Sequence, residues 1–242
     1  MKIGLKLWST NKELFNKANY LYNNKEIDYV ELYVIPGSFK SGINKLNMPT
    51  IIHAPHSGHK FNIANKSLLK SNMEKFEEVK KFAQELNALK IIVHPGYNGE
   101  IYSALKCLEK FNYENILIEN MPVKGLHNEN CLGYIPENIK WLLDIGFKFC
   151  LDFSHAYKAA VSLNLNAKKL IKSFLKLNPY MFHICDGNIN NEFDEHLNLG
   201  EGNFDLKFIK NCIGDKFVTF ETPKKNNLIN DIKNIKYFKG IR

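Results

Sequence analysis

Short apolar runs alternate with segments of helical period along most of the chain. Eight of these runs are rich in β-branched and aromatic residues, which is typical of buried strands. They are Lys2–Trp8, Tyr29–Val34, Thr50–His53, Lys90–His94, Ile116–Glu119, Phe149–Asp152, Met181–Cys185 and Phe217–Glu221. Several runs are apolar at odd and even positions alike, which predicts strands that are covered on both faces and paired in parallel.

The segments between these runs predict helices. In the longest segment, Leu69, Met73, Phe76 and Val79 recur at intervals of three or four residues, which is the spacing of one helix face. The expected helices are Asn11–Asn23, Ser67–Leu86, Ser103–Phe111, Pro136–Leu143, Ala167–Leu177, Leu206–Asn211 and Leu228–Ile235. The segment Pro36–Asn47 is weakly patterned and predicts only a short helix. Asp152 is also placed to cap a helix that begins near His155.

Eight alternating strand and helix units in 242 residues predict a (β/α)8 TIM barrel of the α/β class. The chain is 45% hydrophobic and 12% aromatic, which is enough apolar material for a full core. We find no internal repeat, low-complexity tract or linker, so we expect one domain over residues 1–242 and a monomer.

Cysteine and hydropathy patterns indicate the compartment. The five cysteines are scattered and form no C-x-x-C pair, which favours reduced thiols in a cytoplasmic protein. No apolar stretch reaches the length of a membrane span, and Met1–Trp8 lacks the long apolar region of a signal peptide. We therefore expect a cytoplasmic protein without a membrane partner.

The net charge of +8 is compatible with a polyanionic partner such as DNA. Almost all of the positive charge is lysine, and Arg242 is the only arginine. Since lysine lacks the bidentate fork with which arginine grips phosphate, charge supports a nucleic-acid partner only weakly. A lysine-rich composition of the whole proteome explains the same charge.

Ionisable side chains stand at or near the ends of the last six predicted strands, namely His53, His94, Glu119, Asp152, His183 and Glu221. Three more, His155, Asp194 and His196, follow the sixth and seventh strands. Because chemistry in TIM barrels sits where strands end and the next loops begin, we expect all nine at one mouth. His56 is a doubtful member, and His59 and His127 stay outside the set.

A single histidine or carboxylate at a strand end is more often a hydrogen-bonded structural residue or a helix cap. Nine such groups together would be costly to bury without cations between them. Five imidazoles and four carboxylates without a thiolate favour zinc, manganese or iron over calcium. Nine ligands are too many for one ion, so they favour two or three, an arrangement typical of phosphate-ester hydrolysis.

Six segments carry these residues as motifs. They are Ile52-His-Ala-Pro55, Val93-His-Pro-Gly96, Ile118-Glu-Asn120, Cys150-Leu-Asp-Phe-Ser-His-Ala156, Asp194-Glu-His196 with Leu199-Gly-Glu-Gly-Asn203, and Phe220-Glu-Thr-Pro223. Together they resemble endonuclease IV, the apurinic/apyrimidinic endonuclease family within the xylose-isomerase-like TIM barrels. The resemblance spans roughly residues 51–223 and fills all nine ligand positions of that family.

The resemblance implies a DNA-repair hydrolase that cuts DNA 5′ to abasic sites with three zinc ions, manganese being the other metal we consider. It places His53, His94 and Glu119 on the first ion, Glu119, Asp152, His183 and Glu221 on the second, and His155, Asp194 and His196 on the third. It also gives Glu119, Glu221 and His155 roles in catalysis.

Three segments differ from the family, namely the first strand, the second strand and the loop His56-Ser-Gly-His59, where the family usually has a tyrosine that enters the DNA. The first strand, Gly4–Trp8, has no histidine, and Glu31–Gly37 replaces an Asn-Pro-Arg type segment and looks more like sugar isomerase relatives. Tyr33, His56 and Phe61 would then replace the family's DNA wedge. A sugar isomerase or epimerase is therefore the alternative, with a small sugar as substrate and one ion on Glu119, Asp152, His183 and Glu221. A non-catalytic nucleic-acid-binding relative is a third possibility.

Overall fold

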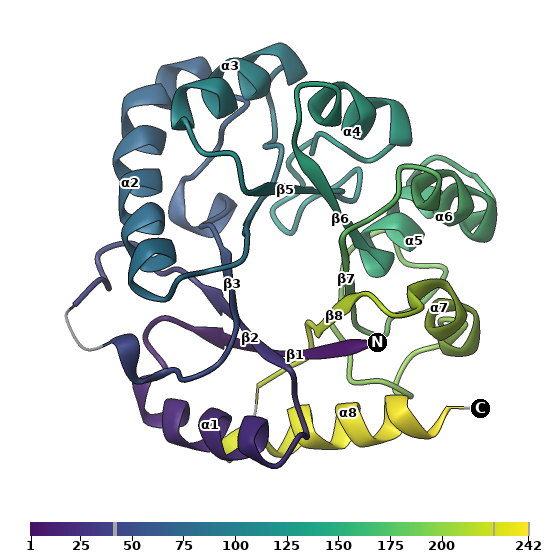
Figure 1. Cartoon of the computed structure of the whole chain (residues 1–242). Helices are drawn as coiled ribbons and strands as arrows, with labels where there is room; N and C mark the ends of the chain where they lie inside the picture. Colours follow the sequence, from purple (N-terminus) through teal and green to yellow (C-terminus); the bar gives the residue numbers. More distant parts are fainter. Residues whose placement is uncertain (41–42, 225, 242) are drawn as a thin grey trace.

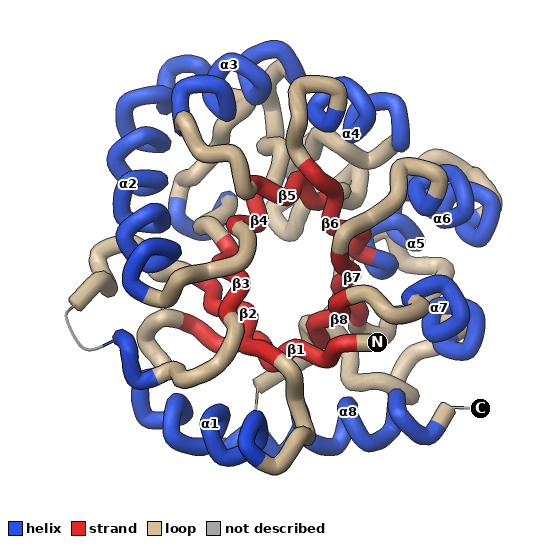
Figure 2. The backbone as a smooth tube through the Cα atoms, in the orientation of Figure 1, coloured by secondary structure: helices blue, strands red, loops and turns tan. Residues whose placement is uncertain are grey.

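The protein is a closed barrel of eight parallel strands surrounded by helices (Figures 1 and 2). The computed structural model describes residues 1–40, 43–224 and 226–241. The strands pair in chain order, and β8 closes the ring on β1. They are β1 Lys2–Trp8, β2 Tyr29–Tyr33, β3 Thr50–His53, β4 Ile91–Val93, β5 Ile116–Glu119, β6 Lys148–Asp152, β7 Met181–Ile184 and β8 Phe217–Phe220. The predicted (β/α)8 fold is confirmed.

Four predicted strands extend past the observed ends, at Val34, His94, Cys185 and Glu221. The regular hydrogen bonding between neighbouring strands stops at each of these residues, but single hydrogen bonds continue beyond that point in places. The Val34 amide donates to the His53 carbonyl over 2.9 Å, and the Glu221 amide donates to the Ile184 carbonyl over 2.8 Å. Isolated bonds of this kind hold the end of a strand without making it a full ladder.

The helices are α1 Phe15–Asn23, α2 Leu69–Glu85, α3 Ile101–Phe111, α4 Pro136–Leu143, α5 Phe153–Ser162, α6 Ala167–Leu175, α7 Leu206–Ile213 and α8 Ile229–Gly240. Within Pro36–Asn47, the expected short helix is the 3-10 turn Ile43–Lys45; residues 41 and 42 lie outside the described residues. The pattern did not list α5 as a helix of its own. Eight of its ten residues are buried, so the solvent-exposed polar face that marks a surface helix is almost missing. The expected cap is confirmed, since the Asp152 side chain accepts from the His155 amide over 2.7 Å.

An apolar plug fills the half of the barrel interior that lies toward the amino-terminal ends of the strands. It consists of Tyr29, Ile51, Ile92, Leu117, Cys150 and Met181, all of them fully buried. Gly4 makes room for the ring of Tyr29, since a Cβ at this position would collide with the ring carbons. The Tyr29 hydroxyl is hydrogen-bonded to Oγ1 of Thr219 over 2.7 Å. The plug therefore supports whatever lies above it, toward the carboxyl ends of the strands.

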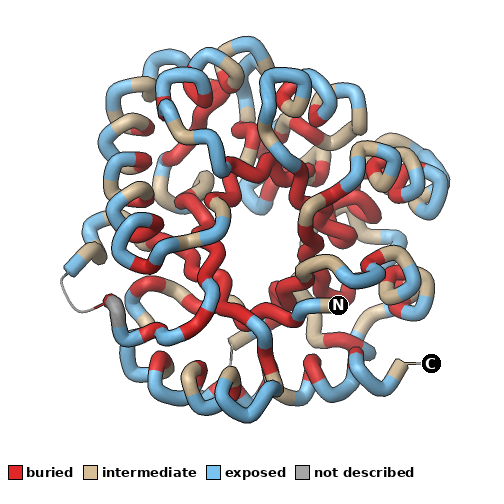
Figure 3. Tube along the Cα trace, in the orientation of Figure 1, coloured by how far each residue is buried: buried red, intermediate tan, exposed pale blue. Residues whose placement is uncertain are grey.

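The outward faces of the strands form the main core. Residues such as Leu5, Leu32, Ile118 and Phe182 pack there with the inner faces of the helices. Figure 3 shows the buried ring of strands and the exposed outer faces of the helices. Across the part of the chain that the structure describes, no helix combines the length and the apolar character needed to cross a lipid bilayer.

Candidate metal centre

Directly above the apolar plug lies a layer of ionisable side chains, one from each strand or the residue after it. Residues two apart in a strand face the same side, so each member of this layer follows an inward-facing residue by two positions. The layer consists of Lys6, Glu31, His53, His94, Glu119, Asp152, His183 and Glu221. Six of these eight are sequence-predicted ligands, and Lys6 and Glu31 are additions that the structure makes.

The first group consists of His53, His94 and Glu119, whose ligand atoms lie within 4.8 Å of one another. Oε2 of Glu119 lies 3.2 Å from Nε2 of His53 and 3.3 Å from Nε2 of His94. Nδ1 of His53 is 2.8 Å from the carbonyl oxygen of Ala54. Because a carbonyl only accepts, Nδ1 carries the proton and Nε2 keeps a free lone pair, as a metal ligand requires.

The second group shares Glu119 with the first and adds Asp152, His183 and Glu221. Nδ1 of His183 lies 3.0 Å from Oε1 of Glu221 and 3.2 Å from Oε1 of Glu119. Burial, with the negative charges of Glu119 and Glu221, raises the pKa of Asp152 to about 7. For Glu119, burial opposes ionisation, but His183 and His94 lower its pKa well below the usual range.

The third group, His155, Asp194 and His196, joins α5 to the loop after β7. Oδ2 of Asp194 lies 3.4 Å from Nε2 of His155 and also pairs with Nε2 of His196. Nδ1 of His155 is 2.8 Å from the Asn120 carbonyl, and Nδ1 of His196 is 2.9 Å from the Glu221 carbonyl. Both Nε2 atoms are therefore free to face Asp194.

Three of the five groups of ligand atoms in the described residues contain all nine predicted ligand residues, divided as the resemblance implied. The other two groups are Glu31, His53, His183 and Glu221, and Glu119, Cys150 and His183. The donor set fits a cation. Among the described residues, the buried atoms without a hydrogen-bond partner include Oε1 of Glu119, Oδ2 of Asp152 and Nδ1 of His183. Buried polar atoms are almost always paired. Three of the six unpaired atoms in the described residues belong to the second group, and the others are Oε1 of Glu31, the Tyr157 hydroxyl and Oδ2 of Asp231. A divalent ion would pair the three atoms of the second group.

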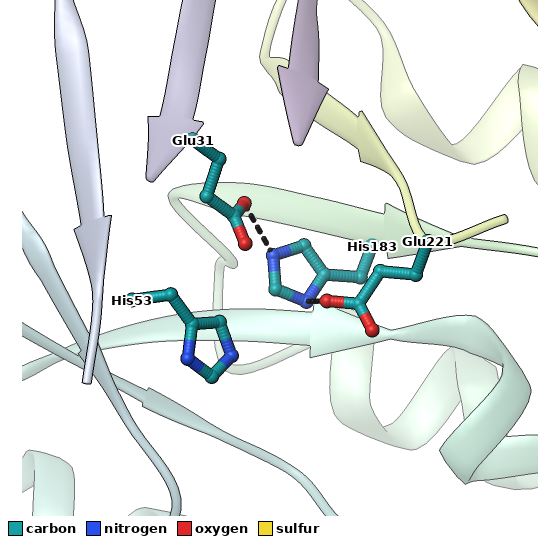
Figure 4. A group of neighbouring side chains, drawn as sticks. All are labelled: Glu31, His53, His183 and Glu221. Atoms are coloured by element: carbon teal, nitrogen blue, oxygen red, sulfur yellow. Dashed lines mark hydrogen bonds and ion pairs between the residues drawn. The ribbon is translucent and has the colours of Figure 1, made fainter. Parts of the chain in front are cut away.

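Lys6 and Glu31 complete the layer and were not among the predicted site residues. Oε2 of Glu31 lies 2.8 Å from Nε2 of His183 (Figure 4). Oε1 of Glu31 lies 3.2 Å from the Lys6 ammonium. Lys6 also pairs with Oε1 of Glu221. Burial opposes the charge on both Lys6 and Glu31, yet their neighbours outweigh it. The pKa of Lys6 is raised, and His183 and Lys6 lower the pKa of Glu31 to about 2.

Aromatic rings line the β2 and β3 side of the centre. The ring of His56 stacks on that of His94, with centroids 5.5 Å apart and planes at 11°. Tyr33 and Phe61 are only 4% and 3% exposed, so the expectation that they protrude into DNA is wrong for these two. Their rings are held inside by packing and by the Tyr33 hydroxyl, which accepts from the His56 amide over 3.3 Å.

A hollow of about 110 Å³ opens over the first and third groups. Its wall beyond the ligands includes His56, Tyr97, Met121 and Lys124. The loop that carries Met121 and Lys124 is held by isolated bridges between Tyr97 and Cys131 and between Lys124 and Asn130. The ligand groups are thus reached from the mouth of the barrel through a narrow, partly apolar opening.

Sequence comparison finds relatives of two kinds. The chain is 28% identical over 222 residues to the probable endonuclease 4 of Halothermothrix orenii, covering 80% of this chain and 79% of that protein. It is 27% identical over 203 residues to the uncharacterized protein MJ1614 of Methanocaldococcus jannaschii, covering 76% of this chain and 75% of that protein. Both relationships extend over most of the barrel.

Solved structures share the fold at low identity. Endonuclease IV from Thermus thermophilus superposes with a TM-score of 0.76 at 18% identity, over 99% of this chain and 98% of that one. A D-tagatose 3-epimerase-like protein gives 0.70 at 21% identity, over 100% and 98%. The family model described as the xylose isomerase-like TIM barrel matches residues 23–238. The chain therefore belongs to the xylose isomerase-like TIM barrel family.

Proposed function

We propose that this chain is a zinc-dependent phosphodiesterase that hydrolyses DNA 5′ to abasic sites. The observation that carries the proposal is the third group, His155, Asp194 and His196, which adjoins two other ligand groups at one mouth. A single-ion isomerase has no use for these three residues. The relationship to a probable endonuclease 4 over 80% of the chain supports the same activity.

The side chains are arranged to hold ions and a phosphate between them. Divalent ions bound to the three groups would supply Lewis acidity, which lowers the pKa of coordinated water and stabilises charge on phosphate oxygens. Glu119 lies within 3.3 Å of His53, His94, His155 and His183, so it is placed to bridge the first two groups. Backbone carbonyls hold His53, His155 and His196 with Nε2 inward.

In this proposal Glu119, Glu221 and His155 have the catalytic roles. The Lys6 ammonium beside Glu221 adds a fixed positive charge at the same place, where a phosphate oxygen would be stabilised. Lys6 stands on the first strand, the one that lacks the histidine motif of endonuclease IV. The chain therefore provides a cation of its own at this position.

A sugar epimerase is the second candidate. The second group of Glu119, Asp152, His183 and Glu221 is by itself complete for one divalent ion. Glu31 supports it from a strand whose sequence looks more like sugar isomerases. This candidate requires neither His155 nor the loop residues Asp194 and His196.

The two candidates are separated by metal content and substrate. Protein loaded with zinc should nick a duplex that contains one abasic site, without added magnesium, and a strong chelator should abolish the nicking. The matched control is the same duplex with an intact base. Loaded protein that leaves the abasic duplex intact at low salt, and epimerises a small ketose instead, would contradict the phosphodiesterase and support the epimerase.

A further inference from the structure

A buried lysine, Lys158, and a partly exposed glutamate, Glu195, connect helix α5 to the loop that follows β7. Lys158 is 0% exposed, and its ammonium donates to Oε2 of Glu195 over 2.7 Å and to the Asn188 carbonyl over 2.9 Å. It also lies 5.3 Å from the centre of the Phe204 ring. An ammonium loses much hydration free energy on burial, and the contacts with Glu195, Asn188 and Phe204 compensate for that loss.

The position of Glu195 indicates what this ion pair does in the protein. Glu195 lies between Asp194 and His196, the two loop residues of the third group. Its Oε2 also accepts from the Asn188 amide over 2.7 Å, so one carboxylate oxygen joins the two ends of the segment 188–195 to α5. The residues on either side of Glu195 are thereby fixed relative to the helix that carries His155.

The same helix holds the loop at a second point. Oγ of Ser154 donates to Oδ1 of Asp194 over 2.5 Å, which leaves Oδ2 of Asp194 facing His155 and His196. Helix α5 thus supplies one residue of the third group, His155, and two supports, Ser154 and Lys158. All three lie within its first two turns.

The backbone at His196 requires such support. Its φ of 49° lies in the left-handed region. This conformation costs a residue with a Cβ about 1 kcal/mol or more, and it persists only where the surrounding structure imposes it. The first and second groups stand on strand ends, whereas Asp194 and His196 stand on a loop, and the His196 side chain is 38% exposed. The third group is the one whose geometry depends on how the loop is anchored.

We propose that Lys158 and Glu195 are a positioning pair that holds Asp194 and His196 in the geometry needed to bind an ion in the third group. An ion pair whose lysine is buried contributes little net stability, because desolvation of the ammonium offsets the attraction, but it can fix one arrangement of the chain. This inference rests on the proposed function insofar as the third group is a metal site. Neither residue touches the substrate or the ion.

The test is metal content, measured ion by ion. Lys158→Met keeps the length and apolar packing of the side chain and removes its charge. We expect the folded variant to bind the ion of the third group about 10- to 100-fold more weakly than wild type, as for the loss of other supports of metal ligands. The ions of the other two groups should stay at wild-type affinity. Competition titration with a chromophoric chelator, together with elemental analysis, measures each step.

A matched control and a second variant complete the design. Lys168→Met makes the same change in an exposed pair with Asp205, where the ammonium is 2.6 Å from Oδ2, and should leave all metal steps unchanged. If Lys158→Met does not fold, Glu195→Gln decides, because it removes the charge and keeps an oxygen that can accept from Asn188. Hydrogen exchange should then show faster exchange confined to residues 186–200.

The outcomes separate this inference from the proposed function. A folded Lys158→Met or Glu195→Gln variant with wild-type affinity at every metal step overturns the inference, as does an equal loss of all ions. Wild-type protein that takes up the third ion and cleaves no phosphodiester contradicts the proposed function alone. Wild-type protein that never takes up a third ion overturns both.

Discussion

Nε2 of His183 lies 2.8 Å from the carboxylate of Glu31, on the side of the ring opposite the second group (Figure 4). Since the carboxylate accepts, this contact places the Nε2 proton toward Glu31 and turns Nδ1 toward Glu119 and Glu221. A carboxylate behind a ligating histidine fixes its tautomer and increases its basicity. Glu31 and His183 together therefore form a support that reaches from β2 across the barrel to β7.

Removing the Glu31 carboxylate should weaken metal binding at the second group. We expect Glu31→Ala to lower the affinity for the ion by about 10- to 100-fold, measured by competition with a chelator. Glu31→Gln is the matched variant, because its amide oxygen can still accept from Nε2, and its loss should be smaller. Equal affinity in Glu31→Ala and wild type would contradict the role given to Glu31.

The third group should be separable from the other two. We expect His196→Ala or Asp194→Ala to remove one metal ion per chain and to lower phosphodiester hydrolysis by orders of magnitude, while circular dichroism shows an intact fold. The control is His127→Ala, which removes an exposed histidine outside the three groups. A single-ion epimerase would lose little activity in the same variants, since its four ligands remain.

Lys6 should matter more to the metal-free protein than to the loaded one. Lys6→Met removes one of the two cationic groups that face Glu31 and Glu221, the other being His183. Breaking a buried pair in this way costs about 3–5 kcal/mol of unfolding free energy. Bound zinc should recover part of that loss, because it neutralises Glu221. Urea denaturation with and without zinc measures the difference.

The comparison for Lys6 is an exposed pair of the same chemistry. Lys140 and Asp144 are 60% and 58% exposed, so Lys140→Met should change the free energy of unfolding by less than about 1 kcal/mol. If Lys6→Met and Lys140→Met lowered the free energy of unfolding of the metal-free protein equally, the ion pairs of Lys6 with Glu31 and Glu221 would not stabilise the fold as we expect.

The metal-free protein should lose stability as the pH rises from 6.5 to 9. Burial opposes the charge on His196, but Asp194 outweighs it and raises the pKa of this imidazole from 6.5 to about 9. A raised pKa means that the folded state holds the proton more tightly, so the stabilisation is complete below pH 6.5 and disappears as the pH passes 9. Because His196 is 38% exposed, solvent screening makes the effect modest.

Chemical denaturation of chelator-treated protein across this pH window tests the prediction. The pKa values of His155 and His183 are also raised, against the effect of burial, by Asp152 and by Cys150 and Glu31 respectively, and they act with the same sign. His196→Asn should therefore reduce the slope without removing it. A stability that rises with pH across this window would show that the carboxylates do not hold protonated imidazoles.

Strand periodicity explains why most of the site was predictable. His53, Glu119 and Asp152 end their strands, and His183 stands one residue before the end of β7. The previous inward residue of each belongs to the apolar plug, so alternation places all four toward the mouth. The same rule, applied to Tyr29, also points to Glu31. The first two strands carry no metal-type motif, so no separate sign in the sequence points to Lys6 or Glu31.

The loop after β7 was not predictable in this way. Asp194 and His196 reach the site because Asp186 folds the loop, accepting from the Gly200 amide over 2.8 Å and the Phe204 amide over 3.1 Å. Such contacts between distant positions leave no periodic trace in a sequence. Their place after the seventh strand and the motif resemblance both pointed to these two residues, but neither pointed to Lys158.

DNA binding at this mouth should depend steeply on salt. The chain has one arginine, so phosphate contacts must come from lysines, and each phosphate that is neutralised adds about 0.9 to the slope of log K against log salt. Lys124 lines the hollow above the ligand groups, and its ammonium donates to Oδ1 of the neutral Asn130 over 2.8 Å. Lys124→Gln should weaken binding to abasic and intact duplexes alike and reduce the slope by about one.

The control is Lys148→Gln, at the amino-terminal end of β6 and thus at the opposite end of the barrel, which should leave slope and affinity unchanged. Fluorescence anisotropy from about 50 to 200 mM salt, with zinc-loaded protein, gives both quantities. An equal effect of the two substitutions would indicate diffuse attraction by the +8 charge. It would contradict the proposal that DNA binds at this mouth of the barrel.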